Sequence, residues 1–117
     1  MASPVRQKRV ADRIRAEIGD LLAREMSDPR LKLVTITDVS IDRELAYASI
    51  WVCRADGDAA KKEVLAALEG AKGFLRRELA ARVQLRHAPQ LVFHWDRAPD
   101  HADKIEHMLD EIKKTEG

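Results

Sequence analysis

The sequence predicts a single α+β domain in which helices pack on one face of a three-stranded mixed sheet. Two long segments repeat apolar residues at three- and four-residue steps, which is typical of amphipathic helices. Three short segments are rich in β-branched and aromatic residues, which is typical of strands. A chain of 117 residues, 45% of them hydrophobic, can bury one core. We expect one domain at residues 1–96 and a C-terminal helix or tail at residues 97–117.

The first helix is expected from about Val5 to Arg24, because its apolar residues form one stripe. Asp28-Pro29 then ends the helical pattern. The first turns of this helix place three arginines beside the apolar stripe, close enough to form one basic ridge: Arg6, Arg9 and Arg13. The start of this ridge could instead be a disordered basic tail that adds phosphate affinity.

Two strands are expected at residues 33–41 and 45–54, joined by the turn Asp42-Arg43-Glu44. The short connection predicts an antiparallel hairpin. In the first strand the apolar phase changes between Ile36 and Val39, which indicates a bulge near Asp38.

A second helix is expected at residues 59–83, after the turn Asp56-Gly57-Asp58, and a third strand at residues 91–95, after Pro89. The connection between the second and third strands should be a right-handed crossover, which makes these two strands parallel. Pro99-Asp100 is expected to open a short terminal helix.

The second helix contains Gly70-Ala71-Lys72-Gly73, a Gly-x-x-Gly between two half-helices. A KH domain holds its nucleic acid at such a place. Glycine lets a phosphate come close, and the following half-helix presents unpaired N–H groups to the anion. Because glycines that merely end or cap a helix are common, spacing alone favours that simpler interpretation.

Five segments in order resemble the ribosome-binding factor A family. They are Arg9-Val10-Ala11, Asp28-Pro29-Arg30-Leu31, Val34-Thr35-Ile36-Thr37-Asp38-Val39, Ala71-Lys72-Gly73-Phe74-Leu75-Arg76, and Leu85-Arg86-His87-Ala88-Pro89-Gln90-Leu91-Val92-Phe93. The match covers roughly residues 5 to 96. Members of the family usually have Ala-x-Gly where this chain has the full Gly-x-x-Gly.

The resemblance implies a type II KH-like fold of order α-β-β-α-(kink)-α-β. The kink is expected at Gly70, Ala71 and Gly73, with Gly70 making it softer, in place of an open KH loop. The resemblance also implies binding to the immature small (30S) ribosomal subunit, contact with its 16S rRNA near the decoding region, late maturation including 5′-end processing, and efficient growth in the cold. Other assembly factors, such as assembly GTPases, are possible partners.

Charge is distributed unevenly, although the net charge is only +1. Residues 61–86 hold seven basic and three acidic residues, the densest basic segment of the chain. The candidate RNA contacts in this segment are Lys72, Arg76, Arg77, Arg82 and Arg86. For each arginine a simply solvated helix face is the alternative. The two tryptophans, Trp51 and Trp95, could stack on bases but are expected in the core.

An enzyme is not expected. The four histidines, His87, His94, His101 and His107, lack metal-ligand spacing, and Cys53 is the single cysteine. We expect no cofactor and no metal. The apolar runs are too short for a membrane span, and the N-terminus lacks a signal-peptide core, so a cytoplasmic protein is expected. It should be monomeric, because its basic face is not apolar. A generic KH module for messenger RNA and a protein adaptor using the acidic C-terminal helix stay open as alternatives.

Overall fold

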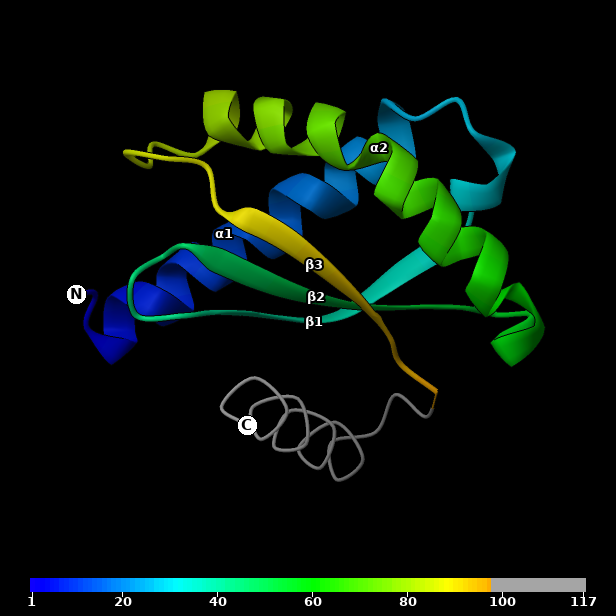
Figure 1. Ribbon diagram of the computed structural model, residues 1–117, viewed down its shortest axis with the longest axis horizontal. Coiled ribbons are helices and arrows are strands. Elements are labelled where there is room, and N and C mark those ends of the chain that lie inside the picture. The colour runs from blue at the N-terminus through cyan, green and yellow to red at the C-terminus, as the bar shows by residue number, and fades with distance from the viewer. Residues whose placement is uncertain (98–117) are drawn as a thin grey trace.

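The structure is a computed structural model that describes residues 1–97, and the terminal helix expected from Pro99 lies outside these residues. Figure 1 shows the helices and strands in this part of the chain. Their order is α1 (Pro4–Arg24), the 3-10 turn η1 (Pro29–Leu31), β1 (Val34–Ile41), β2 (Tyr47–Arg54), the 3-10 turn η2 (Gly57–Ala60), α2 (Lys61–Arg82) and β3 (Gln90–Trp95). The predicted α+β class is confirmed.

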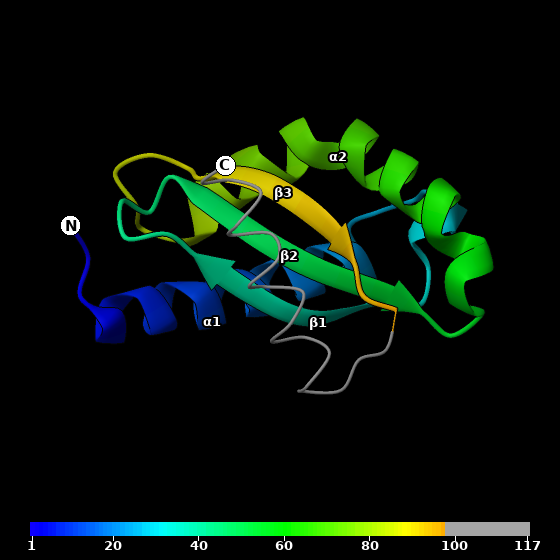
Figure 2. The ribbon, with the colours of Figure 1, turned by 60° about the horizontal axis from the view of Figure 1, so that its bottom comes forward.

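The sheet is mixed, as predicted, with strand order β1-β2-β3. β1 and β2 pair antiparallel, and β2 and β3 pair parallel. Ile50, at the centre of β2, pairs with Val39 on one side and Phe93 on the other. These residues belong to one core or its border, together with the apolar stripes of α1 and α2, so both helices pack on the same sheet face. Figure 2 shows the sheet from another side, with α2 arching over it.

The bulge predicted near Asp38 is present. Ile36 pairs with Val52 and Asp38 pairs with Trp51, so Thr37 is the extra residue of β1. The Thr37 hydroxyl donates a hydrogen bond to Asp96 Oδ2 at 2.6 Å and lies 3.3 Å from the carbonyl oxygen of Trp51. Because an extra residue reverses the alternation of side chains, Ile36 and Val39 can both face the helices.

The hairpin turn is held by one carboxylate. The Asp42 Oδ1 atom accepts hydrogen bonds from the backbone N–H groups of Ala46 (2.7 Å) and Tyr47 (2.9 Å). Leu45, inside the turn, has a φ of 56°, in the left-handed region that favours glycine. The Ala2 N–H donates to the Arg43 carbonyl at 2.8 Å, so the N-terminus is tied to this turn.

Both tryptophans are buried, as expected: Trp51 is 2% exposed and Trp95 6% exposed. The Trp95 indole N–H donates to Asp58 Oδ1 at 2.8 Å, and the ring of Trp51 stacks on that of His94 with 4.6 Å between centroids. Neither ring is available to a base.

Helix α2 runs without a break through the Gly-x-x-Gly segment. Gly57 is the one glycine among residues 1–97 with a positive φ, so Gly70 and Gly73 have ordinary helical dihedrals. Figures 1 and 2 show α2 changing direction about midway along its length. The structure therefore has one continuous, bent helix in place of two half-helices, and, as expected, no open loop of the KH type forms here.

We predict that Gly70→Ala stabilises the protein by about 0.5–1 kcal/mol, because alanine loses less backbone entropy than glycine in a helix. An added Cβ at Gly70 meets no atom within 4 Å. Urea unfolding measures the change. Gly57→Ala is the control. Gly57 has a φ of 77°, which alanine adopts only with strain, so this substitution should destabilise the protein. Destabilisation by Gly70→Ala would mean that the bend of α2 requires glycine.

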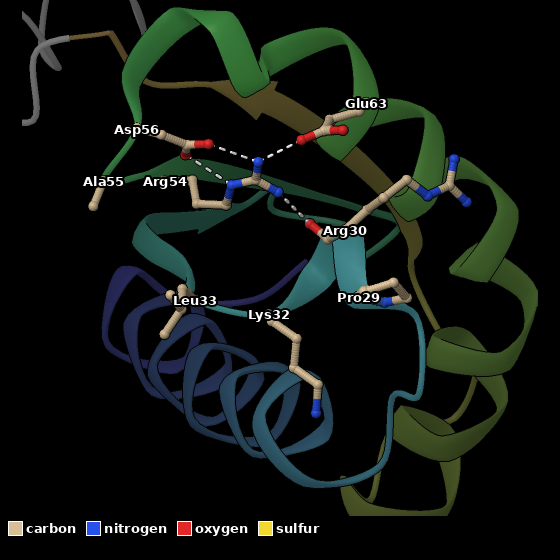
Figure 3. A pocket seen from close by; sticks show the side chains of 8 residues that line it. All are labelled: Pro29, Arg30, Lys32, Leu33, Arg54, Ala55, Asp56 and Glu63. Atoms are coloured by element: carbon tan, nitrogen blue, oxygen red, sulfur yellow. Dashed lines mark hydrogen bonds and ion pairs between the residues drawn. The ribbon is translucent and has the colours of Figure 1, made fainter.

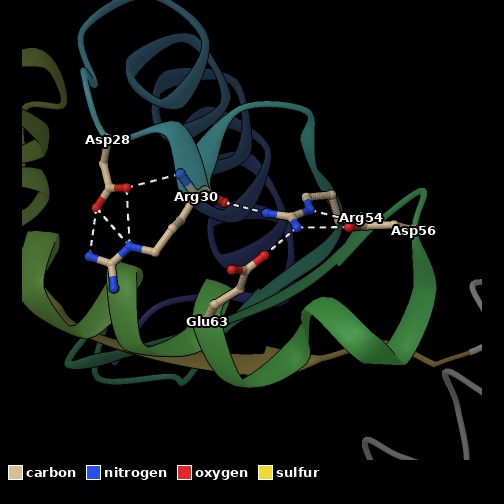
Figure 4. Close-up of polar contacts among 5 residues, drawn as sticks. All are labelled: Asp28, Arg30, Arg54, Asp56 and Glu63. Carbon is tan, nitrogen blue, oxygen red and sulfur yellow. Dashed lines mark hydrogen bonds and ion pairs between the residues drawn. The ribbon is translucent and has the colours of Figure 1, made fainter.

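Arg54, at the end of β2, joins three elements (Figures 3 and 4). Its guanidinium binds Asp56 with two hydrogen bonds of 2.8 and 2.7 Å, makes a short ion pair with Glu63 of α2, and donates to the Arg30 carbonyl of η1 at 2.8 Å. The pKa of Arg54 is raised, first by Asp56 and then by Glu63, and the hydrogen bonds from Arg54 lower the pKa of Asp56 from its usual 3.8. Arg54 thus fastens η1, β2 and α2 together.

We predict that Arg54→Met lowers the free energy of unfolding at neutral pH, and that this loss shrinks in acid. A carboxyl whose pKa is depressed by folding stabilises the native state above its unfolded pKa, and that stabilisation disappears as the pH falls through the folded value. For Asp56 this stabilisation is lost as the pH falls below 3.8. Urea unfolding across the acidic range measures the difference. Arg24→Met, which removes an exposed pair with Asp20, is the control with little expected effect. A loss that is equal at all pH values would contradict an ionic role.

Candidate nucleic-acid interface

Arg82, the last residue of α2, is an internal tie. Its Nη1 atom lies 2.9 Å from Asp20 Oδ2 and 3.1 Å from Glu17 Oε2, both on α1. The hydrogen bonds that Arg82 donates to Asp20 and then to Glu17 raise the pKa of Arg82. With its charge matched by two carboxylates and its side chain 26% exposed, Arg82 holds the two helices together and has little charge left for phosphate.

Arg13 of the predicted ridge belongs to the same cluster. Its Nε atom donates to Glu17 at 3.1 Å, and its Nη2 atom donates to the carbonyl oxygen of Arg82 at 3.1 Å. A cation here also compensates the negative end of the α2 dipole. Arg6 and Arg9 lie on the same flank of α1 as Arg13, whose guanidinium reaches the end of α2.

Arg76 is a second internal tie. Its Nη2 atom donates to the carbonyl oxygen of Ala88 at 2.9 Å, and its Nε atom donates to that of Pro89 at 3.2 Å. These bonds fasten residues 83–89, which connect α2 to β3, against the side of α2. Sequence reasoning missed this role, because no charge pattern identifies backbone carbonyls as the partners of an arginine.

The remaining predicted cations face solvent. Among residues 1–97, four of them are exposed and make no side-chain hydrogen bond or ion pair: Arg6, Arg9, Arg77 and Arg86. Lys72 is half-buried and pairs with Glu69 at 2.8 Å on the same helix. The structure therefore divides the eight predicted contacts into unpaired surface cations and cations that already have partners.

Three of the four unpaired cations, Arg6, Arg9 and Arg86, lie toward one end of the molecule, and Arg77 lies on α2. Arg86 lies in segment 83–89, which Arg76 holds in place. In both Figure 1 and Figure 2 this segment lies at the same end of the molecule as the β1–β2 turn and the start of α1. The turn adds Arg43, an exposed arginine without a carboxylate partner in the described part of the chain, which sequence analysis treated only as a turn residue. We call this region, formed by the start of α1, residues 42–46 and residues 83–89, the hairpin end.

A hollow of about 590 Å³ lies at the opposite end of the sheet (Figure 3). Its basic residues are mostly neutralised. Arg54 is bound by Asp56 and Glu63, and Arg30 is bound by both oxygens of Asp28, the shortest contact being 2.7 Å. The hydrogen bonds from Arg30 lower the pKa of Asp28. With two of its three cations paired, this hollow is a poor site for an anion.

Residues 1–97 hold neither a metal site nor a membrane-spanning helix. No group of three or more His, Cys, Asp or Glu side chains there is placed to hold a metal ion. No helix of this part is both long enough and apolar enough to cross a membrane.

The family model described as "Ribosome-binding factor A" matches residues 6–109 of the chain. A ribosome-binding factor A of Desulforamulus reducens is 40% identical over 111 residues, which cover 95% of this chain and 92% of that protein. One from Syntrophobacter fumaroxidans is 42% identical over 113 residues, covering 95% of this chain and 97% of that protein.

Solved structures agree. The crystal structure of ribosome-binding factor A from Thermus thermophilus has a TM-score of 0.69 at 26% identity, over 79% of this chain and 98% of that one. A Thermus thermophilus homology model fitted into the map of a 30S–RbfA complex has a TM-score of 0.58 at 27% identity, over 81% of this chain and 96% of that one. From sequence, segment order and fold together, the chain belongs to the ribosome-binding factor A family.

Proposed function

We propose that the protein binds the free, immature small ribosomal subunit through its 16S rRNA and promotes late maturation, including processing of the 5′ end. The observation that carries the proposal is the set of exposed arginines without carboxylate partners, Arg6, Arg9, Arg77 and Arg86. Cations of this kind displace counterions from phosphates and gain affinity by doing so. The family membership and the 30S complex of the Thermus thermophilus relative support a ribosomal target.

The proposed action is that of an adaptor without chemistry of its own. Binding energy from phosphate contacts favours one arrangement of the RNA, and no cofactor or metal takes part. We propose a cytoplasmic monomer that works beside other assembly factors, for example assembly GTPases. Lys72 and Arg77 extend the contact along α2, while Arg13, Arg76 and Arg82 contribute by holding the surface in shape.

We predict that Arg77→Glu combined with Arg86→Glu weakens binding to purified small subunits at least tenfold. The slope of log affinity against log salt should become shallower by about 1 for each lost phosphate contact. Both side chains are exposed and unpaired, so circular dichroism should report an unchanged fold. Co-sedimentation at several salt concentrations measures affinity and slope together.

Lys32→Glu combined with Lys62→Glu is the matched control. It changes the net charge by the same amount, on exposed residues away from the hairpin end. The control should bind as the unmodified protein does. Equal loss in both variants would indicate a general effect of net charge. Normal binding by the first variant would move the contact to the α1 ridge, which Arg6→Glu with Arg9→Glu then tests.

In cells, we predict that loss of the protein leaves small-subunit RNA with unprocessed 5′ ends and slows growth most in the cold, where misfolded RNA rearranges slowly. Primer extension on 16S rRNA and subunit profiles at low and normal temperature measure this. Complementation by the Lys32→Glu, Lys62→Glu control, and none by the Arg77→Glu, Arg86→Glu variant, is expected. Normal 5′ ends at low temperature would contradict a role in processing.

A further inference from the structure

Tyr47 is the exposed aromatic residue of this protein. The chain has five aromatic side chains, of which both tryptophans are buried and both phenylalanines are half-buried against the core. Tyr47 is 57% exposed. Its ring adds little to folding and leaves a flat π surface open to solvent.

The ring is held on a rigid base. Tyr47 is the first residue of β2, and its neighbour Ala48 is fully buried toward the helices, so Tyr47 projects from the outer face of the sheet. Its backbone N–H is bound by Asp42, and it pairs with Gln90 of β3. A side chain on a fixed backbone with two rotatable bonds loses little entropy when it binds a ligand.

Two exposed arginines that lack a carboxylate partner in the described residues lie on the segments next to this position, and Arg43 Nη1 also lies 4.0 Å from Met1 Sδ. Arg43 lies in the same turn, and Arg86 lies in the segment that leads to Gln90, whose N–H donates to the Ala46 carbonyl at 2.8 Å. This hydrogen bond joins the end of the segment to the turn, and Figures 1 and 2 show both at the same end of the molecule. Two carboxylates, Asp42 and Glu44, share the turn, and Asp42 already accepts two backbone N–H groups. Counting Arg6 and Arg9 of α1, basic residues outnumber acidic ones at the hairpin end.

We propose that Tyr47 stacks on one unpaired base of the RNA while Arg43 and Arg86 hold phosphates of the same strand. This inference deepens the proposed function and rests on it. Unpaired bases stack on aromatic side chains beside basic grooves, and such stacking accepts any base. A duplex keeps its base faces covered, so the site takes a single-stranded segment of RNA.

The test compares Tyr47→Leu, which removes the ring but keeps an apolar side chain, with Tyr47→Phe, which keeps the ring. For purified small subunits, Tyr47→Leu should weaken affinity about tenfold, and Tyr47→Phe should stay within about twofold of the unmodified protein. Stacking carries no charge, so the salt slope should be the same for all three proteins. Circular dichroism checks that each variant folds.

A second arm uses a ten-nucleotide oligouridylate, alone and paired with its complement, with ultraviolet cross-linking mapped by mass spectrometry. The single strand should cross-link at Tyr47 and the duplex should not. If the unmodified protein binds subunits but Tyr47→Leu binds them equally well, the stacking inference alone is overturned. If the unmodified protein fails to bind subunits, the proposed function is overturned. If Tyr47→Leu and the unmodified protein bind the oligouridylate equally well, the stacking inference is overturned, whatever the result with subunits. Equal losses in Tyr47→Leu and Tyr47→Phe would assign the effect to the hydroxyl and also overturn it.

Discussion

One apolar sheet face has to serve both helices, and the rest of the structure depends on that constraint. The inward residues of all three strands and the stripes of α1 and α2 form a single core. The bulge at Thr37 exists because β1 would otherwise turn part of its apolar set outward. Since β2 and β3 are parallel, α2 must cross over the same face, which places its end against α1 and leaves residues 83–89 to return at the sheet's edge.

Whether an arginine has a partner depends on where it lies relative to this core. Where the two helices meet, Arg82 and Arg13 are matched by carboxylates of α1. Where the return segment lies against α2, Arg76 binds backbone carbonyls. At the hairpin end, Arg86 and its neighbours have no such partners and stay available. The tied arginines therefore shape the surface that the unpaired ones present.

The continuous α2 changes how RNA binding has to be understood. A KH loop would hold phosphate with backbone N–H groups at a glycine turn, but in an unbroken helix the N–H groups of this region are already bonded. Recognition must then rely on side chains, namely exposed arginines and, as we propose, one exposed ring. Such a surface recognises the phosphate charge of RNA and its single-stranded state more than its base sequence.

The sequence by itself determined the elements and their pairing. Periodicity located both helices and all three strands, the phase change between Ile36 and Val39 located the bulge, and the order of motifs identified the family. These are local properties of the backbone, which the period of side chains reports directly.

Only the tertiary structure decided which arginines are unpaired, because Arg82 meets Glu17 across 65 residues of sequence and Arg76 meets carbonyls that carry no sequence signal. It also decided that the glycines of α2 stay helical, since packing of Leu68 before them and Leu75 after them against the core holds both halves of the helix in one piece. Ion pairs and helix continuity depend on distances between elements, and those distances exist only after the core has formed.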